Sequence, residues 1–236
     1  MSFEGKVVIV TGAGGNLGAA TLAVLSRGGA RIVAADLRDD AVERSLAATG
    51  EPARHLGVAG IDLAEETSCA TLVAHALERF GRIDGLATTV GGFAAAPLAQ
   101  TDADLLLRML RINAVTTLNI MRAVVPPMRA AGAGSLVMVG AASALHAGAG
   151  IAAYAAGKSA ALRMVESFAD ELRPDCVRVN AVLPGTIDTP QNRSAMPDAD
   201  HGAWVSPAQI AEVIAFLLSD AASGITGALI PVAGRG

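Results

Sequence analysis

The stretch KVVIVTGAGGNLG, which runs from Lys6 to Gly18, decides the fold class of this 236-residue chain. Its β-branched first part, Lys6–Thr11, predicts a short buried strand, and the glycines after it predict a tight turn into a helix over Ala19–Arg27. The N–H groups at the start of such a helix favour a bound pyrophosphate. Because Leu17 departs from the common G-x-G-x-x-G spacing, the loop alone is a weak indication of dinucleotide binding.

The alternation of strand and helix continues to the end of the chain. Further strands are expected over Arg31–Ala35, Arg54–Gly60, Ile83–Thr88, Ser135–Gly140, Val177–Val182 and Ala228–Val232. Further helices are expected over Asp39–Ala48, Glu65–Phe80, Thr101–Ala130, Ala152–Leu172 and Pro207–Ser219. This order predicts an α/β fold with a parallel sheet covered on both faces, in a single domain over residues 1–236. The one long connection, Pro184–Pro207, predicts a lid, with a plain surface loop as the alternative.

Composition narrows the class of protein. A net charge of −4 gives no basic excess for a nucleic-acid partner. Cys69 and Cys176 lie far apart, and no His or Cys cluster has metal-ligand spacing, so neither a metal nor a disulfide is expected. The apolar runs are too short or too interrupted to span a membrane, and no leader is visible. We therefore expect a cytoplasmic protein that acts on a small molecule.

An acidic residue marks the end of the second strand. Asp36 follows Arg31–Ala35, about 20 residues after the glycine loop, where a carboxylate can bind both hydroxyls of an adenosine ribose. The same carboxylate repels a 2′-phosphate, so NAD(H) is the expected cofactor. Arg38, two residues later, leaves NADP(H) possible. The alternative is that Asp36 is only a turn or helix-capping residue.

The single tyrosine of the chain, Tyr154, stands four residues before Lys158, one of two lysines. On a helix this spacing puts both side chains on one face. A nearby ammonium favours the phenolate and lowers a tyrosine pKa from its usual value near 10, so Tyr154 can exchange a proton with a reacting atom. The lysine can also hold a ribose hydroxyl. A surface tyrosine with an incidental lysine is the alternative.

Together these motifs resemble the short-chain dehydrogenase/reductase family over essentially the whole chain. Thr11–Gly18 resembles its T-G-x-x-x-G-x-G loop, Tyr154–Lys158 its Y-x-x-x-K pair, and Pro184–Thr189 its P-G-x-x-x-T segment. Asn113, within Arg-Ile-Asn-Ala-Val, stands where the family has an asparagine that bends a helix and holds a proton-relay water. The resemblance implies a Rossmann-like, doubly wound, seven-stranded parallel sheet, hydride transfer to or from a nicotinamide, and a homodimer or homotetramer.

The resemblance also implies a set of cofactor-binding residues. They are Gly12, Gly14, Gly15, Asn16, Leu17, Gly18, Asp36, Leu37, Asp62, Leu63, Thr89, Val90, Gly91, Tyr154, Lys158, Pro184, Gly185, Ile187 and Thr189. Within this set, Asp62 falls where the family contacts adenine. The Pro184–Thr189 segment falls where it contacts the nicotinamide carboxamide.

Three departures from the family pattern matter. Asn16 replaces the middle glycine, which should be tolerable because asparagine accepts left-handed backbone angles. Thr88–Gly91 stands where the family has N-N-A-G. Ala141 occupies the position of the catalytic serine, thirteen residues before Tyr154, and a missing donor of this kind typically costs about 10²–10³ in rate. Ser143 offers a substitute hydroxyl, or is a turn residue.

A narrower resemblance concerns the missing serine. The lid, residues 186–206, resembles that of dihydropteridine reductases and their bacterial relatives in Asp188–Pro190, Asn192–Arg193, Met196–Pro197 and Trp204. Those reductases also lack the serine and keep the tyrosine–lysine pair. A quinonoid dihydropterin is conjugated and easily reduced, so it needs less polarisation than a ketone. The alternative is that the lid marks a structural subfamily that acts on different substrates.

The leading expectation is therefore an NAD(H)-preferring reductase. Tyr154 is its acid, Lys158 the partner and Asn113 the holder of the relay water. Ala141, His146 and Trp204 are expected to face the substrate. One alternative is a carbonyl reductase or alcohol dehydrogenase, 3-oxoacyl reductase-like, that uses Ser143 or a water. Another is a catalytically idle nucleotide-binding sensor, which Ala141 favours and the retained Tyr154–Lys158 pair opposes.

Overall fold

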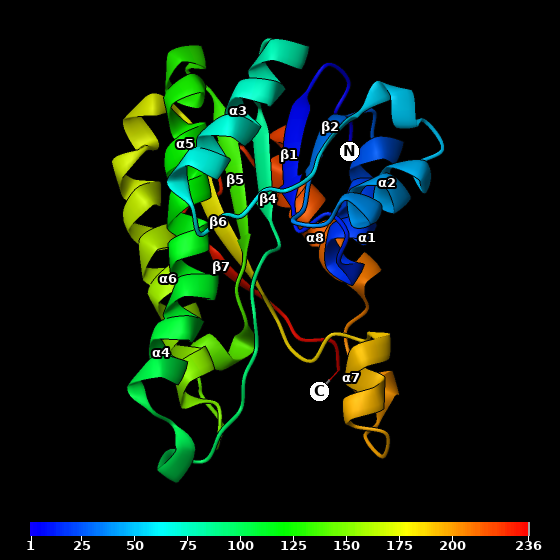
Figure 1. Cartoon of the computed structure of the whole chain (residues 1–236). Coiled ribbons are helices and arrows are strands. Elements are labelled where there is room, and N and C mark those ends of the chain that lie inside the picture. The colour runs from blue at the N-terminus through cyan, green and yellow to red at the C-terminus, as the bar shows by residue number, and fades with distance from the viewer. Residues whose placement is uncertain (236) are drawn as a thin grey trace.

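The computed structural model describes residues 1–235 and contains one seven-stranded sheet. The strands lie in the order β3-β2-β1-β4-β5-β6-β7, and every neighbouring pair is parallel (Figure 1). They span β1 Val7–Thr11, β2 Arg31–Ala35, β3 Leu56–Val58, β4 Gly85–Thr88, β5 Gly134–Val139, β6 Val177–Pro184 and β7 Leu229–Val232. The predicted doubly wound, Rossmann-like α/β fold is confirmed.

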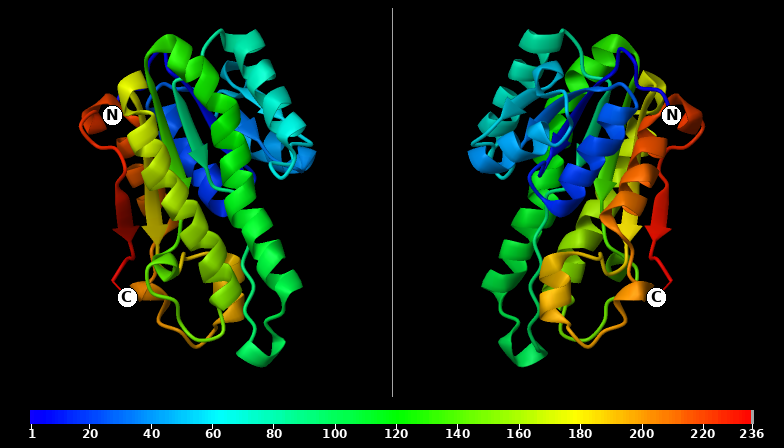
Figure 2. Two further views of the ribbon diagram at one scale, coloured as in Figure 1. Left: turned by 90° about the vertical axis from the view of Figure 1, so that its left-hand side faces the viewer. Right: turned by 90° about the vertical axis from the view of Figure 1, so that its right-hand side faces the viewer.

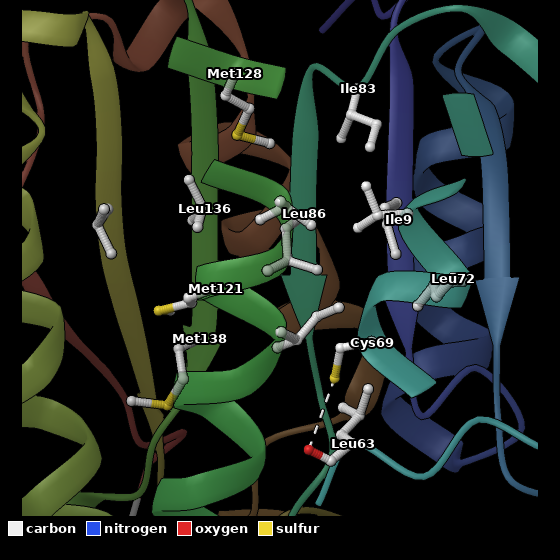
Figure 3. Packing of buried hydrophobic residues seen from close by; sticks show 14 of the residues in the cluster. Ile9, Leu63, Cys69, Leu72, Ile83, Leu86, Met121, Met128, Leu136 and Met138 are labelled. Atoms are coloured by element: carbon white, nitrogen blue, oxygen red, sulfur yellow. Dashed lines mark hydrogen bonds between the residues drawn. The ribbon is translucent and has the colours of Figure 1, made fainter. Parts of the chain in front are cut away.

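Helices cover both faces of the sheet. They span α1 Asn16–Arg27, α2 Asp39–Ala47, α3 Glu66–Phe80, α4 Ala103–Leu110, α5 Thr116–Ala131, α6 Ala152–Glu171, α7 Pro190–Ala195 and α8 Pro207–Leu218. α3, α5 and α6 pack on one face, in the core drawn in Figure 3, and α1, α2 and α8 pack on the other. Successive residues of β1 alternate between the two cores, Ile9 toward the first and Val8 and Val10 toward the second, as a strand's period of two requires.

Two predicted elements differ from the structure. The helix expected over Thr101–Ala130 is α4 and α5 joined by a π-helical turn, Arg111–Val115, which contains Asn113. The strand expected over Arg54–Gly60 shrinks to three residues. A 3₁₀ turn over Pro52–Arg54 precedes it, and Gly60 adopts a left-handed φ of 72° after it. Local turn chemistry therefore overrode the apolar pattern there.

The carboxyl ends of the strands open at one edge of the sheet, and the site lies there. Figure 2 shows α7 and the loop between β4 and α4 projecting from this same end of the molecule. The α7 helix was not anticipated within the lid. It forms because the Thr189 side chain caps it by accepting from the Asn192 N–H at 3.2 Å, and because Pro190 suits a first helical position. Within residues 1–235, no helix is long and apolar enough to cross a membrane.

Candidate active site

A cleft of about 690 Å³ lies at the carboxyl ends of β1, β2 and β4. Its lining includes Gly12, Gly14–Gly18, Asp36–Arg38, Ile61–Ala64, Thr89–Gly91, Ile187 and Thr189. Of the residues implied as cofactor-binding, Tyr154, Lys158, Pro184 and Gly185 lie outside this lining. Pro184 ends β6, and the Gly185 N–H donates to the Val232 carbonyl at 3.4 Å.

The glycine loop leaves no room for side chains at two positions. A Cβ on Gly18 would lie 2.0 Å from the Gly12 carbonyl oxygen, and one on Gly14 would lie 2.2 Å from Cβ of Ala41. Gly12 itself adopts a left-handed φ of 70°. The start of α1 carries no capping side chain and no acidic residue in its first turn, so its N–H groups and positive dipole end face the cleft. This arrangement suits a pyrophosphate.

Asn16 is tolerated for a different reason from the one expected. Within residues 1–235, Cys176 is the one non-glycine residue with a positive φ, so Asn16 is not left-handed. It is instead the first residue of α1, where any side chain adopts ordinary helical angles. Its side-chain Nδ2 donates to Oε1 of Gln191 in the lid, at 2.9 Å.

Threonine hydroxyls brace the loop where the family pattern has asparagines. The Thr11 hydroxyl donates to Oγ1 of Thr88 at 3.1 Å, and the Thr89 hydroxyl donates to the Thr11 carbonyl at 2.8 Å. These short side chains connect the end of β4 to the end of β1. The departure at Thr88–Gly91 therefore retains polar contacts that hold the glycine turn in place.

Two acidic side chains, those of Asp36 and Asp62, line the cleft beyond the glycine loop. Asp36 accepts from the Gly14 N–H at 3.0 Å through Oδ2 and from the Arg38 N–H at 3.2 Å through Oδ1. The exposed Asp62 accepts from the Ala64 N–H at 2.8 Å. Asp36 therefore connects the glycine turn to the end of β2, at the place where a ribose would meet both.

Lys158 is buried beside the cleft. Its Nζ donates to the Val139 carbonyl at 2.9 Å, and burial lowers its pKa to about 8. A Cβ on Gly91 would lie 2.8 Å from this Nζ and 2.8 Å from Oδ1 of Asn113. Both polar groups therefore pack against Gly91, a residue of the cleft lining, on the side where a Cβ would lie.

Asn113 uses its carboxamide to hold backbone. Nδ2 donates to the carbonyls of Gly92 and Met109 at 2.9 and 3.0 Å, and Oδ1 accepts from the Gly92 N–H at 3.2 Å. The bond to Met109, four residues earlier, connects the Asn113 side chain in the π turn to the backbone of α4. The pair of bonds to Gly92 fixes the loop that follows β4.

Tyr154 differs from expectation in its acidity. Burial raises the pKa of its hydroxyl above the ordinary value, whereas the sequence predicted that Lys158 would lower it. The cause is that desolvation disfavours the phenolate while the lysine Nζ faces the Val139 carbonyl. Tyr154 is therefore a neutral phenol at pH 7, the form that donates a proton.

Phe93 packs against the tyrosine and was missed by the sequence reasoning. Its ring meets that of Tyr154 edge-to-face, with centroids 4.9 Å apart and planes at 72°. Although it is aromatic, Phe93 is 66% exposed. The available signal was an aromatic directly after Gly91-Gly92 at the end of a strand. Arg108 and Arg111, which also line the cleft, gave no signal that distinguishes them from other helix-surface arginines.

The serine position and its neighbours form a short turn. Ala141 is buried, Ser143 lies partly exposed in the 3₁₀ turn Ala142–Ala144, and His146 is exposed. Trp204 packs against His201 within the lid, with ring centroids 4.5 Å apart. Within residues 1–235, no three His, Cys, Asp or Glu side chains gather in a way that suits a metal ion.

Comparison with known proteins gives consistent matches. The family model described as short chain dehydrogenase matches residues 6–200. A 3-oxoacyl-acyl-carrier-protein reductase of Thermotoga maritima is 29% identical, over 99% of this chain and 98% of its own. A cis-4-hydroxycyclohexanecarboxylate dehydrogenase of Sinomonas cyclohexanicum is 32% identical, over 99% and 97%. The structure of an NAD⁺-bound xylitol dehydrogenase superposes with a TM-score of 0.90, at 28% identity, over 99% of this chain and 100% of its own.

Proposed function

The chain belongs to the short-chain dehydrogenase/reductase family of NAD(P)-dependent oxidoreductases, and we propose that it is an NADH-preferring reductase of a flat, conjugated acceptor of the dihydropterin type. The family assignment leaves the idle-sensor alternative without support, because the matched relatives named above are oxidoreductases. The cofactor preference and the acceptor are argued from this chain's own residues.

The residues present fit a dinucleotide. Gly14 and Gly18 pack so closely against Ala41 and the Gly12 carbonyl that neither position can hold a side chain, and the uncapped start of α1 lies beside this tight turn. Asp36 lies one hydrogen bond away from Gly14, so a ribose hydroxyl there meets a carboxylate rather than a cation. This favours NAD(H), although Arg38 on the same rim gives NADP(H) a weaker alternative.

When bound, the reduced nicotinamide supplies a hydride. Tyr154 supplies the proton, because its hydroxyl is protonated at pH 7 and burial raises its pKa further. Lys158 orients the ribose and stabilises the phenolate that remains after proton transfer. Asn113 holds Gly92, and with it the loop that carries Phe93, in a fixed position beside Tyr154.

The acceptor is inferred from two observations. Buried Ala141 stands thirteen residues before Tyr154, where the family pattern has a hydroxyl donor, and the exposed ring of Phe93 lies edge-on to the tyrosine. A site with an aromatic wall and without a second donor favours a planar ring that is already activated for hydride addition. Trp204 in the lid and His146 are proposed to face this acceptor.

The test is NADH consumption, followed by its absorbance, with freshly generated quinonoid dihydropterin. We expect turnover well above the non-enzymatic rate, abolished by Tyr154→Phe while NADH binding is retained. No turnover in the presence of bound NADH would refute the acceptor class. Turnover retained by Tyr154→Phe would refute the role of the tyrosine.

A second candidate is a carbonyl reductase or alcohol dehydrogenase. Ser143 lies two residues after Ala141 in the turn Ala142–Ala144, and a 3-oxoacyl-acyl-carrier-protein reductase is among the relatives. Ser143→Ala separates the two readings, because only an enzyme that polarises a carbonyl through Ser143 should slow strongly. We further propose one domain over residues 1–236, a homo-oligomer of two or four chains, and a cytoplasmic location.

A further inference from the structure

The lid and the glycine loop are joined by one side-chain bond. Asn16 Nδ2 donates to Gln191 Oε1 at 2.9 Å, across a separation of 175 residues in the chain. Asn16 lines the cleft on the side of the glycine loop. Gln191 stands two residues after Thr189, which lines the cleft from the lid. The bond therefore connects the two walls of the cleft.

The lid segment that carries Gln191 is internally braced. The Thr189 hydroxyl caps α7, Nδ2 of Asn192 donates to the Ile187 carbonyl at 2.8 Å, and Arg193 makes two bonds to the Asp188 carboxylate. At its base the lid is paired through Ile187 and Val205. Because of this bracing, a restraint on Gln191 acts on the whole of α7.

We propose that Asn16 and Gln191 form a latch that holds the lid over the cleft and limits the rate at which the dinucleotide leaves. The proposal rests on the placement of the cofactor in this cleft, given above. Asn16 stands where the family pattern has glycine, and glycine has no side chain that can reach the lid. The latch is thus a property of this chain rather than of the motif.

Its expected effect is modest and measurable. Both side chains are exposed, so the bond competes with water, and its loss should raise the dissociation rate of NADH about 3–10-fold. If the latch acts as a gate, the association rate rises with it. The equilibrium dissociation constant then changes less than either rate.

The experiment measures NADH dissociation by stopped-flow fluorescence, with excess NAD⁺ as the displacing ligand. Gln191→Ala and Asn16→Ala are each expected to raise the rate about 3–10-fold, and the double variant is expected to be no faster than either alone. Gln191→Glu, which keeps an acceptor for Asn16, should stay within about twofold of the wild type. Ser194→Ala, an exposed position on the same helix, is the matched control and should leave the rate unchanged.

Each outcome has one meaning. An unchanged rate in Gln191→Ala, or additive effects in the double variant, would overturn the latch. Gln191 is outside the cleft lining, so its substitution removes the bond to Asn16 without removing a lining side chain. If the wild-type protein fails to bind NADH, the cofactor placement has failed rather than the latch. Thermal unfolding of each variant establishes that it is folded.

Discussion

Lys158→Met should make the protein more stable while abolishing its activity. The side chain of Lys158 is 6% exposed, and its Nζ has the Val139 carbonyl as a partner. Burial lowers its pKa from 10.5 to about 8. At pH 7 the folded protein therefore holds a buried ammonium that the unfolded chain would expose to water, and a methionine of similar length removes this cost.

The magnitude follows from the two pKa values. A pKa of about 8 in the folded protein, against 10.5 in the unfolded chain, corresponds to a destabilisation of about 3 kcal/mol at pH 7. The cost is fully present below pH 8 and disappears as the pH rises toward 10.5, because the unfolded chain then loses the same proton. Lys158→Met also loses the hydrogen bond to the Val139 carbonyl, and this loss offsets about 1 kcal/mol of the gain in stability. Lys158→Met should thus be about 2 kcal/mol more stable than the wild type at pH 7, and this advantage should vanish near pH 10.

Urea unfolding of both proteins at pH 7 and at pH 10 measures the difference. Lys158→Leu serves as a second apolar variant, so that one poorly fitting side chain does not decide the result. A variant less stable than the wild type at pH 7, or a difference that does not change with pH, would refute the reasoning that this ammonium is retained at the expense of stability.

Three other substitutions test the cleft. Asp36→Ala should lower the preference for NADH over NADPH at least 10-fold, because a charged acceptor for the ribose is lost; equal ratios of the two dissociation constants before and after would contradict it. Phe93→Ala should raise KM for a planar acceptor about 3–10-fold and leave NADH affinity unchanged, and an equal loss with an aliphatic ketone would show that the ring has no preference for flat substrates. Gly18→Ala places a Cβ 2.0 Å from the Gly12 carbonyl, so we expect a free energy of unfolding lower by about 2 kcal/mol and weakened NADH binding; a Tm within a degree of the wild type would show that the loop adapts.

The fold was predictable because its signals are local and repeated. Each strand is a short apolar run, most helices begin after polar or glycine residues, and their alternation restricts the connections to one hand. The glycine loop, Asp36 and Asp62 line one cleft, because the carboxyl ends of parallel strands meet at one edge. The pattern of strands and helices was therefore sufficient to predict that these distant residues lie in one cleft.

The predictions that were wrong concern features that depend on tertiary contacts. The acidity of Tyr154 follows from burial and from the direction of Lys158, neither of which residue order specifies. The π turn at Arg111–Val115 exists where Asn113 bonds to Gly92, 21 residues away. The same is true of Asn16, whose backbone angles were wrongly expected to be left-handed and whose partner lies in the lid.

The two walls of the cleft differ in how freely they can change. The glycine turn follows β1, whose Val8, Ile9 and Val10 supply both cores, so a change there is felt across the whole sheet. The lid residues from Gln191 to Asp200 are mostly exposed and belong to neither core. Substitutions in that segment should alter which acceptors fit while leaving the stability of the fold almost unaffected. The wall formed by the glycine turn, where we propose that the cofactor binds, is thus tied to both cores, and the choice of substrate can diverge independently in the lid.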